Sequence, residues 1–277
     1  MATAQATIMT FNLRRATVLD GANAWRYRKS RAAEAIRAGG ADFVGTQEGF
    51  RRMLQELTSL LPGYAYLGEG RKGGGADEHN AILYREDAWA PERSGTFWLS
   101  ETPDAPGSRG WGSVFPRICT WALFRRVDDP DVRVAVFNTH LDHISANARK
   151  RGAALVADRL RDELRTFGGP AVMIGDFNAK PHSEAICQLS ETYRLISAYD
   201  VYPGGTKAAG ATYHGFRGGG ARGEPIDYIF AAGADCELRL TAVHRAKVRG
   251  KFPSDHYPVS TTVSWRAAEA RDEGGGR

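Results

Sequence analysis

The chain has 277 residues, of which 42% are hydrophobic, and this is enough to bury a sizeable core in one or two domains. Its composition excludes a disordered or fibrous protein, and its apolar runs are shorter than the roughly 20 residues that a membrane helix needs. The formal net charge of +5 suits a phosphate-bearing substrate, but the basic residues form no concentrated nucleic-acid-binding patch.

The start of the chain lacks the basic stretch and apolar run of a secretory signal, so we expect a cytoplasmic location by default. It predicts instead a first strand over residues 7–12, rich in β-branched and apolar side chains. Two helices and two strands follow, and Gly39 and Pro62 provide the stop signals of the helices. These elements are a helix over 25–38, a strand over 42–46, a helix over 50–61 and a strand over 80–84.

The second half of the chain continues this mixture of strands and helices. An apolar stripe that includes Val156, Leu160 and Leu164 predicts a long amphipathic helix. The predicted elements are strands over 117–124 and 132–139, a helix over 145–167, and strands over 171–175, 226–230 and 257–263. The pattern favours two packed sheets with helices outside, in a single domain over 1–265. The polar, glycine-rich residues 266–277 predict a disordered tail.

Polar side chains recur where the predicted apolar strands end, which predicts that they meet at one rim of the sheets. Carboxylate and amide oxygens are the ligands that Mg²⁺ prefers, and histidines nearby can move protons near neutral pH. The three cysteines lack the Cys-x-x-Cys spacing of a zinc site, so we expect Mg²⁺, with Mn²⁺ able to replace it. The strand-end residues are Asn12, Gln47, Glu48, Asn138, His140, Asp142, Asp176, Asn178, Asp227, Asp255 and His256.

Five short motifs occur in order along the chain and together resemble the endonuclease/exonuclease/phosphatase superfamily. They are Gly-Thr-Gln-Glu, Asn-Thr-His-Leu, Gly-Asp-Phe-Asn, Ile-Asp-Tyr-Ile and Ser-Asp-His, and the resemblance spans residues 7–263. The stretch from Phe97-Trp-Leu-Ser to Phe115-Pro-Arg-Ile resembles a bacterial branch of the superfamily. The resemblance implies an α/β fold, a four-layer sandwich in which two central, mainly antiparallel mixed sheets are flanked by helices.

The resemblance also implies roles for the residues of the metal and phosphate site. Glu48 resembles the principal Mg²⁺ ligand, with Asn12 beside it and Asp255 at the metal edge. Asp176 resembles the carboxylate that positions or deprotonates the attacking water. Asn178 resembles the amide that binds the phosphate.

Two histidines and their partners complete the implied set. His256 resembles the histidine that stabilises the phosphorane-like transition state, and Asp227 the residue that orients it. His140 resembles the second histidine of the nuclease and deadenylase branches, and Glu78 the glutamate that pairs with it in pancreatic deoxyribonuclease. Arg117 resembles an arginine that reaches a phosphate oxygen there. Asn138, at the start of the Asn-Thr-His motif, completes the expected substrate-binding residues.

The activity expected from these residues is metal-dependent phosphodiester hydrolysis by an activated water, on a nucleic acid or a smaller phosphodiester. The motif of Asn138 and His140 favours a diesterase over the alternative, a phosphomonoesterase of the inositol-phosphate type. A non-catalytic binding module is the third reading, but such a module need not keep Glu48, Asp176 and His256 together. We expect a monomer without membrane insertion. Specificity is expected in the loops over 68–77, 99–115 and 200–223.

Overall fold

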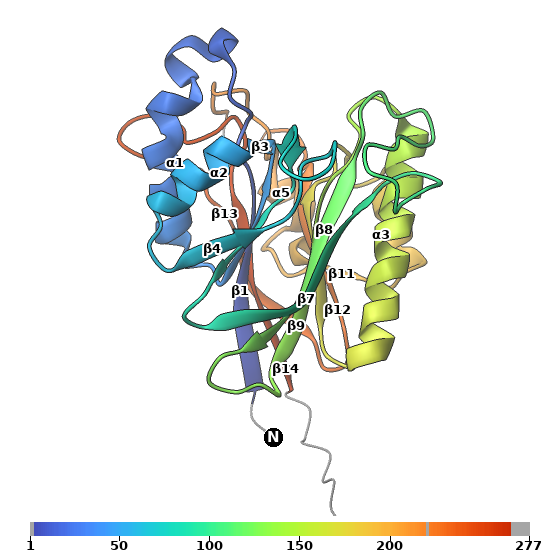
Figure 1. Cartoon of the computed structure of the whole chain (residues 1–277). Coiled ribbons are helices and arrows are strands. Elements are labelled where there is room, and N and C mark those ends of the chain that lie inside the picture. The colour runs from blue at the N-terminus through green and yellow to red at the C-terminus, as the bar shows by residue number, and fades with distance from the viewer. Residues whose placement is uncertain (1–2, 220–221, 267–277) are drawn as a thin grey trace, which may run out of the picture.

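Two six-stranded sheets pack face to face in the computed structural model, which describes residues 3–219 and 222–266 (Figure 1). In the first sheet β1 and β2 are parallel and the other neighbouring strands are antiparallel. Its order is β13 (Glu237–Val243), β14 (Val259–Arg266), β1 (Thr3–Asn12), β2 (Phe43–Gln47), β6 (Ile82–Arg85) and β4 (Tyr64–Leu67).

The second sheet repeats this mixed arrangement, with β9 and β10 parallel and the other neighbours antiparallel. Its order is β11 (Ile196–Ser197), β12 (Asp227–Ala232), β10 (Ala171–Asp176), β9 (Arg133–His140), β8 (Ile118–Arg126) and β7 (Trp89–Trp98). A small third sheet pairs β3 (Gly49–Phe50) with β5 (Glu78–His79).

Helices cover the outer faces of both large sheets, so the predicted four-layer α/β sandwich is confirmed. The helices α1 (Trp25–Gly39) and α2 (Arg51–Ser59) pack on the first sheet through one apolar cluster. The helices α3 (Ala146–Phe167) and α4 (Glu184–Glu191) lie on the other side, where α3 packs on β9 and β10. Shorter helical turns are η1 (Val18–Asn23), η2 (Ala198–Asp200) and α5 (Gly205–Ala209).

The three predicted helices are confirmed within two residues at each end, because each carries strong boundary signals. Ser145 caps α3 by accepting a hydrogen bond from the backbone N–H of Ala148, and Gly168 ends it in the left-handed conformation with φ of 73°. None of the helices in the described part of the chain is both apolar and long enough to cross a membrane.

The four edge strands of the large sheets, β4, β7, β11 and β13, were not predicted, nor were the short strands β3 and β5. β7 contains Pro91 and a register shift directly after it, and β13 has a register shift after Arg239 and one buried residue among its seven, so neither shows an apolar strand pattern. Arg266, expected at the start of the tail, is instead the last residue of β14 and pairs with Thr3. The rest of that tail, 267–277, lies outside the described residues.

A polar bridge between the two sheets lies at the end where β1, β2, β9 and β10 finish. The side-chain amide of Asn138 on β9 donates to the carbonyl oxygens of Thr46 and Ala81, both at 2.9 Å. Gln47 on β2 donates back to Asn138 Oδ1 at 2.7 Å. Gly45 leaves the space that Asn138 fills, since an added Cβ would lie 2.8 Å from its Cγ. These contacts hold both sheets in register directly beneath the strand ends.

Candidate active site

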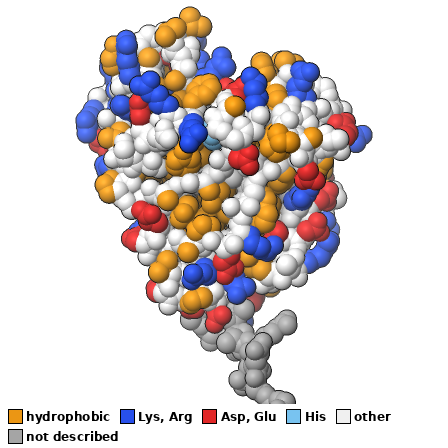
Figure 2. Space-filling view, in the orientation of Figure 1, with side chains coloured by type: hydrophobic (Ala, Val, Ile, Leu, Met, Phe, Trp, Pro, Cys, Tyr) orange, Lys and Arg blue, Asp and Glu red, His pale blue; other side chains and the backbone are white. Residues whose placement is uncertain are grey.

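The strand ends meet in a cleft of about 390 Å³ between the two sheets. Sheet register produces this meeting, because Asp176 pairs with His140 on one side and with Asp227 on the other, while Asn12 pairs with Gln47. In the space-filling view, Lys and Arg side chains gather over this upper end of the molecule (Figure 2). The cleft is lined by Arg14, Arg15, Glu48, Arg71, Glu78, Phe115, Arg117, His140, His143, Asp176, Asn178, Tyr213, Ile226, Asp255 and His256.

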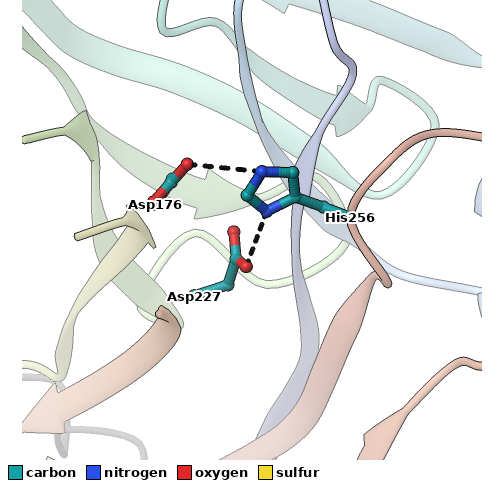
Figure 3. Close-up of side chains that lie close together, drawn as sticks. All are labelled: Asp176, Asp227 and His256. Atoms are coloured by element: carbon teal, nitrogen blue, oxygen red, sulfur yellow. Dashed lines mark hydrogen bonds and ion pairs between the residues drawn. The ribbon is translucent and has the colours of Figure 1, made fainter. Parts of the chain in front are cut away.

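A buried imidazole lies between two buried carboxylates at the centre of the site (Figure 3). His256 Nδ1 is 2.9 Å from Asp227 Oδ2, and its Nε2 is 3.7 Å from Asp176 Oδ2. Burial by itself lowers the pKa of His256, but the charge and hydrogen bond of Asp227, with the charge of Asp176, raise it to about 10. His256 is therefore an imidazolium at neutral pH, with its Nε2–H directed towards Asp176.

Asp176 is held at both carboxylate oxygens by two amides. Its Oδ2 accepts from the side chain of Asn12 at 3.0 Å, and its Oδ1 accepts from the backbone N–H of Asn178 at 2.9 Å. Burial, and then the charge of Asp227, raise the pKa of Asp176 to about 7, while His256 opposes the rise. A carboxylate that titrates near neutral pH can accept a proton from water.

The second histidine, His140, approaches the same carboxylate oxygen of Asp176 as His256 does. His140 Nε2 is 3.5 Å from Asp176 Oδ2 and 2.9 Å from Asn178 Nδ2, which also donates to the Leu141 carbonyl oxygen at 3.0 Å. An amide N–H donates to that ring nitrogen, so His140 is neutral with its proton on Nδ1. Its burial, followed by the charge of Arg117, lowers the pKa of His140 well below its ordinary value.

Glu48 and Asp255 form the acidic edge of the cleft. Glu48 accepts hydrogen bonds from the Arg15 backbone N–H at 2.9 Å and from the Asn12 side chain at 3.1 Å. Burial alone would raise the pKa of Glu48, but these two hydrogen bonds lower it overall. The pKa of Asp255 is raised by burial and further by the charge of Glu48. A cation between the two carboxylates would offset this repulsion, so they fit the divalent ion that the sequence predicts.

Asn12 differs from the expected metal ligand in how its side chain is used. Its amide nitrogen donates to both Glu48 and Asp176, and its oxygen accepts from the Arg14 backbone N–H at 2.9 Å. It therefore joins the acidic edge to the central carboxylate. Glu48 and Asn178 both have positive φ, 62° and 47°, and such strained non-glycine backbone is concentrated at functional sites.

A second group of titratable side chains, Asp176, Asp227 and His256, also lies close enough to hold an ion. We favour the acidic edge instead, because both ring nitrogens of His256 already face carboxylates. A metal on that ring would displace the hydrogen bond to Asp227.

Two expected substrate-binding residues, Arg117 and Asn138, and the expected catalytic residue Glu78 have different surroundings in the structure. Arg117 lines the cleft, as the sequence predicts. Asn138 does not reach the cleft, because its side-chain amide makes its hydrogen bonds within the bridge between the sheets. In the part of the chain that the structure describes, Glu78 pairs with Arg71 at 3.1 Å and with Arg15 at 3.4 Å in place of the expected partner His140.

Several cleft residues had no motif that could identify them in the sequence. Arg71 lies in a glycine-rich loop that was expected to influence substrate specificity, but the sequence predicted no role for the residue itself. His143 was expected on the surface at the rim, and it lines the cleft. Phe115 and Tyr213 belong to loops whose paths only the fold determines. A larger groove of about 1030 Å³ lies beside η1, α1 and α2, but Glu56 is the one acid in its lining and no histidine joins it. The chemistry therefore belongs to the smaller cleft.

Solved structures of other proteins share this fold. A structure of an endonuclease/exonuclease/phosphatase family protein from Bacteroides thetaiotaomicron has a TM-score of 0.88 at 31% identity and covers 99% of both chains. The mannosyl-6-phosphatase of the same organism has a TM-score of 0.85 at 33% identity, covering 93% of this chain and 99% of its own.

More distant structures share the fold. The human nocturnin catalytic domain has a TM-score of 0.69 at 18% identity, covering 96% of this chain and 97% of its own. No curated protein matches the chain. The model of the endonuclease/exonuclease/phosphatase family matches residues 9–256, and the protein therefore belongs to that family of phosphoesterases.

Proposed function

We propose that the protein is a divalent-metal-dependent phosphoester hydrolase that attacks phosphorus with an activated water. The observation that carries this proposal is Asp176, a buried carboxylate within 3.5 Å of one imidazole and 3.7 Å of another. Of these two rings His256 is charged and His140 is neutral, so one can neutralise a developing oxyanion while the other can exchange a proton.

Each residue then has one role in the reaction. Asp176, fixed by Asn12 and Asn178, orients the attacking water and takes its proton. His256, held by Asp227, donates its Nε2–H to a non-bridging oxygen on which charge develops. Glu48 and Asp255 would hold the metal ion, which supplies charge neutralisation on the phosphoryl oxygens when it is bound.

Among phosphoesters, a small monoester fits the observations best. A relative that is 33% identical over most of this chain is named a mannosyl-6-phosphatase. The motif that favoured a diester loses one of its two residues, because Asn138 lies between the sheets and only His140 lines the cleft. The cleft volume of about 390 Å³ also suits a sugar-phosphate-sized ligand.

A phosphodiester is the second candidate, and His140 is the observation that favours it. His140 Nε2 lies 3.5 Å from Asp176 Oδ2, so the proton that Asp176 takes from water can pass to the neutral ring and from the ring to the leaving oxygen. The leaving oxygen of a monoester and of a diester departs as the same kind of alkoxide, so it is the resemblance of His140 to the second histidine of the nuclease and deadenylase branches that favours the diester.

A panel of substrates with Mg²⁺ or Mn²⁺ tests the proposal. Mannose 6-phosphate, para-nitrophenyl phosphate, bis-para-nitrophenyl phosphate, single-stranded DNA and RNA would be compared by kcat/KM, with EDTA as the control. We expect turnover of the monoesters above that of the diesters, and none in EDTA. Full activity in EDTA would remove the metal from the proposal, and faster turnover of the diesters would reverse the order of the two candidates.

The metal-binding edge has a test of its own. Glu48→Gln removes one charge at nearly constant shape, so the Mg²⁺ concentration for half-maximal activity should rise on the order of tenfold or more. Glu86→Gln, on the loop after β6 and outside the cleft lining, is the matched control. An unchanged Mg²⁺ requirement in Glu48→Gln would assign the metal to other residues.

A further inference from the structure

One side of the cleft is formed by basic and aromatic side chains from separate segments of the chain. Arg15 follows β1, Arg71 lies in the loop before β5, Phe115 and Arg117 precede β8, and His143 follows β9. We call these five residues the arginine wall. His140 joins the wall to the catalytic centre, because it lines a small pocket together with Arg71 and Arg117 and its ring lies 3.5 Å from Asp176.

Arg71 is held in one orientation from behind. Its Nε is 2.9 Å from Asp77 and its Nη1 is 3.1 Å from Glu78, and its backbone carbonyl accepts from the indole of Trp98 at 2.6 Å. Its guanidinium lies 5.0 Å from the ring centre of Phe115. The side chain is 8% exposed, so a long and flexible residue is fixed before any ligand arrives.

Arg117 has an N–H group that lacks a partner. It is 6% exposed, and no hydrogen bond reaches its Nε from the described residues. Asp142 lies 3.6 Å away, but it already accepts from the backbone N–H groups of Ile144 and Ser145 and from Ser113. Another nitrogen of Arg117 donates to His143 at 2.8 Å. The Nε side of the guanidinium faces Asp142, so this buried ion pair holds Arg117 at the edge of the cleft.

Charge is distributed unevenly across the wall. Three arginines face the cleft, and Glu78 is the one acid of the wall region that lines it, while Asp77 and Asp142 lie behind the guanidinium groups. The acids therefore hold in place three arginines that line the cleft. Arginine in this fixed, planar arrangement binds phosphate and carboxylate through paired hydrogen bonds.

In the proposed reaction His256 and the metal-holding acidic edge neutralise the reacting phosphoryl group, which leaves the wall for another part of the substrate. We propose that the arginine wall binds a second anionic group, a phosphate or a carboxylate, on the leaving-group part of the substrate. This inference rests on the proposed phosphoester hydrolysis and narrows it to substrates with two separated anionic groups.

Two matched pairs of substrates test this preference and distinguish the two anions. Fructose 6-phosphate is compared with fructose 1,6-bisphosphate, and glycerol 3-phosphate with 3-phosphoglycerate, by phosphate release at saturating Mg²⁺. In at least one pair we expect kcat/KM for the second member to exceed that of the first by roughly ten- to a hundredfold, as a charged hydrogen bond provides. A preference for fructose 1,6-bisphosphate identifies the second anion as a phosphate, and a preference for 3-phosphoglycerate identifies it as a carboxylate.

Variants locate the preference in the wall. Arg71→Gln should reduce the ratio of kcat/KM within the preferred pair by on the order of tenfold. Arg15→Gln, whose side chain is about half exposed and so tolerates substitution, should reduce the same ratio and serves if Arg71→Gln does not fold. Lys72→Gln removes a charge from the same loop at an exposed position outside the cleft lining, and the ratio should stay unchanged.

The outcomes separate this inference from the proposed function. Equal kcat/KM within both pairs overturns the second-anion subsite and leaves the hydrolase proposal intact. If Arg71→Gln lowers kcat/KM equally for both members of a pair, Arg71 binds the reacting phosphate, and the second-anion subsite is also overturned. No hydrolysis of any phosphoester by the folded, metal-loaded protein overturns both.

Discussion

Single residues of the site depend on one another through charge. Asp227 raises the pKa of both its neighbours: it stabilises the proton on His256, and it disfavours ionisation of Asp176. The neutral state of His140 depends on burial and on the cationic wall beside it. Two rings of the same type are thereby kept in opposite protonation states within one cleft.

His256→Ala tests the transition-state role of the imidazolium. If its Nε2–H stabilises charge that develops on the phosphoryl oxygen, kcat should fall on the order of 10²-fold or more with a smaller change in KM. Asp227→Asn should be milder, and the double variant little worse than His256→Ala, because the two residues act together. Near-normal kcat in folded His256→Ala would show that the ring is structural.

The pH dependence of kcat/KM gives a second test at this scale. Asp176 must lose its proton to accept one from water, and His256 must keep its proton, so activity should rise through about pH 7 and fall near pH 10. Asp227→Asn removes the charge that raises both pKa values, so both limbs should move to lower pH. Limbs that stay in place would show that other groups control the profile.

At the scale of elements, a buried arginine on α1 joins two loops of the active site. Arg28 is fully buried and donates to the carbonyl oxygens of Leu13, Arg14 and Arg15 after β1, and to that of Pro253, which precedes Asp255 and His256. Burial lowers the pKa of Arg28 to about 10, so it stays charged at neutral pH. The helix thus positions the backbone that holds Glu48 and Asp255.

Arg28→Met should loosen both loops together. Loss of these buried hydrogen bonds should lower the free energy of unfolding by roughly 2–4 kcal/mol. In the folded fraction, the Mg²⁺ concentration for half-maximal activity should also rise, since the acidic edge loses its alignment. Denaturant unfolding and metal titration measure the two effects. Arg26→Met, at an exposed position on the same helix, is the control and should change neither.

At the scale of the whole molecule, the active site depends on how the two sheets are joined. Glu48 and His256 belong to segments next to the first sheet, whereas His140, Asp176 and Asp227 belong to the second. The bridge made by Asn138, Gln47 and the carbonyl oxygens of Thr46 and Ala81 is buried directly below them. A shift of one sheet against the other would therefore separate the catalytic groups.

Asn138→Ala distinguishes this structural role from substrate binding. It leaves buried polar groups of the bridge with fewer partners, so the free energy of unfolding should fall by roughly 1–3 kcal/mol. At a temperature where the variant is folded, KM should stay close to that of the unmodified protein. Asn147→Ala, on the exposed face of α3, provides the control. A large rise in KM without loss of stability would show that Asn138 binds the substrate.

Local pattern alone determined the elements with strong signals. The three long helices, eight of the strands and the polar ends of those strands could be predicted, because side-chain periodicity and stop residues act over a few positions. The order of the motifs also indicated the family and the four-layer fold. The edge strands β4, β7, β11 and β13 could not be predicted, because they are short, little buried or interrupted by Pro91 and pair only where the sheet offers an edge.

Only the tertiary structure decided what each polar strand end contacts. Asn138 and His140 are two residues apart on one strand, yet the first points into the bridge between the sheets and the second lines the cleft. Glu78 pairs with arginines because the loop before β5 folds Arg71 back onto it and the distant segment after β1 brings Arg15 to it. A sequence lists donors and acceptors, but hydrogen bonds and ion pairs depend on distances of a few ångströms, which the packing of the two sheets sets.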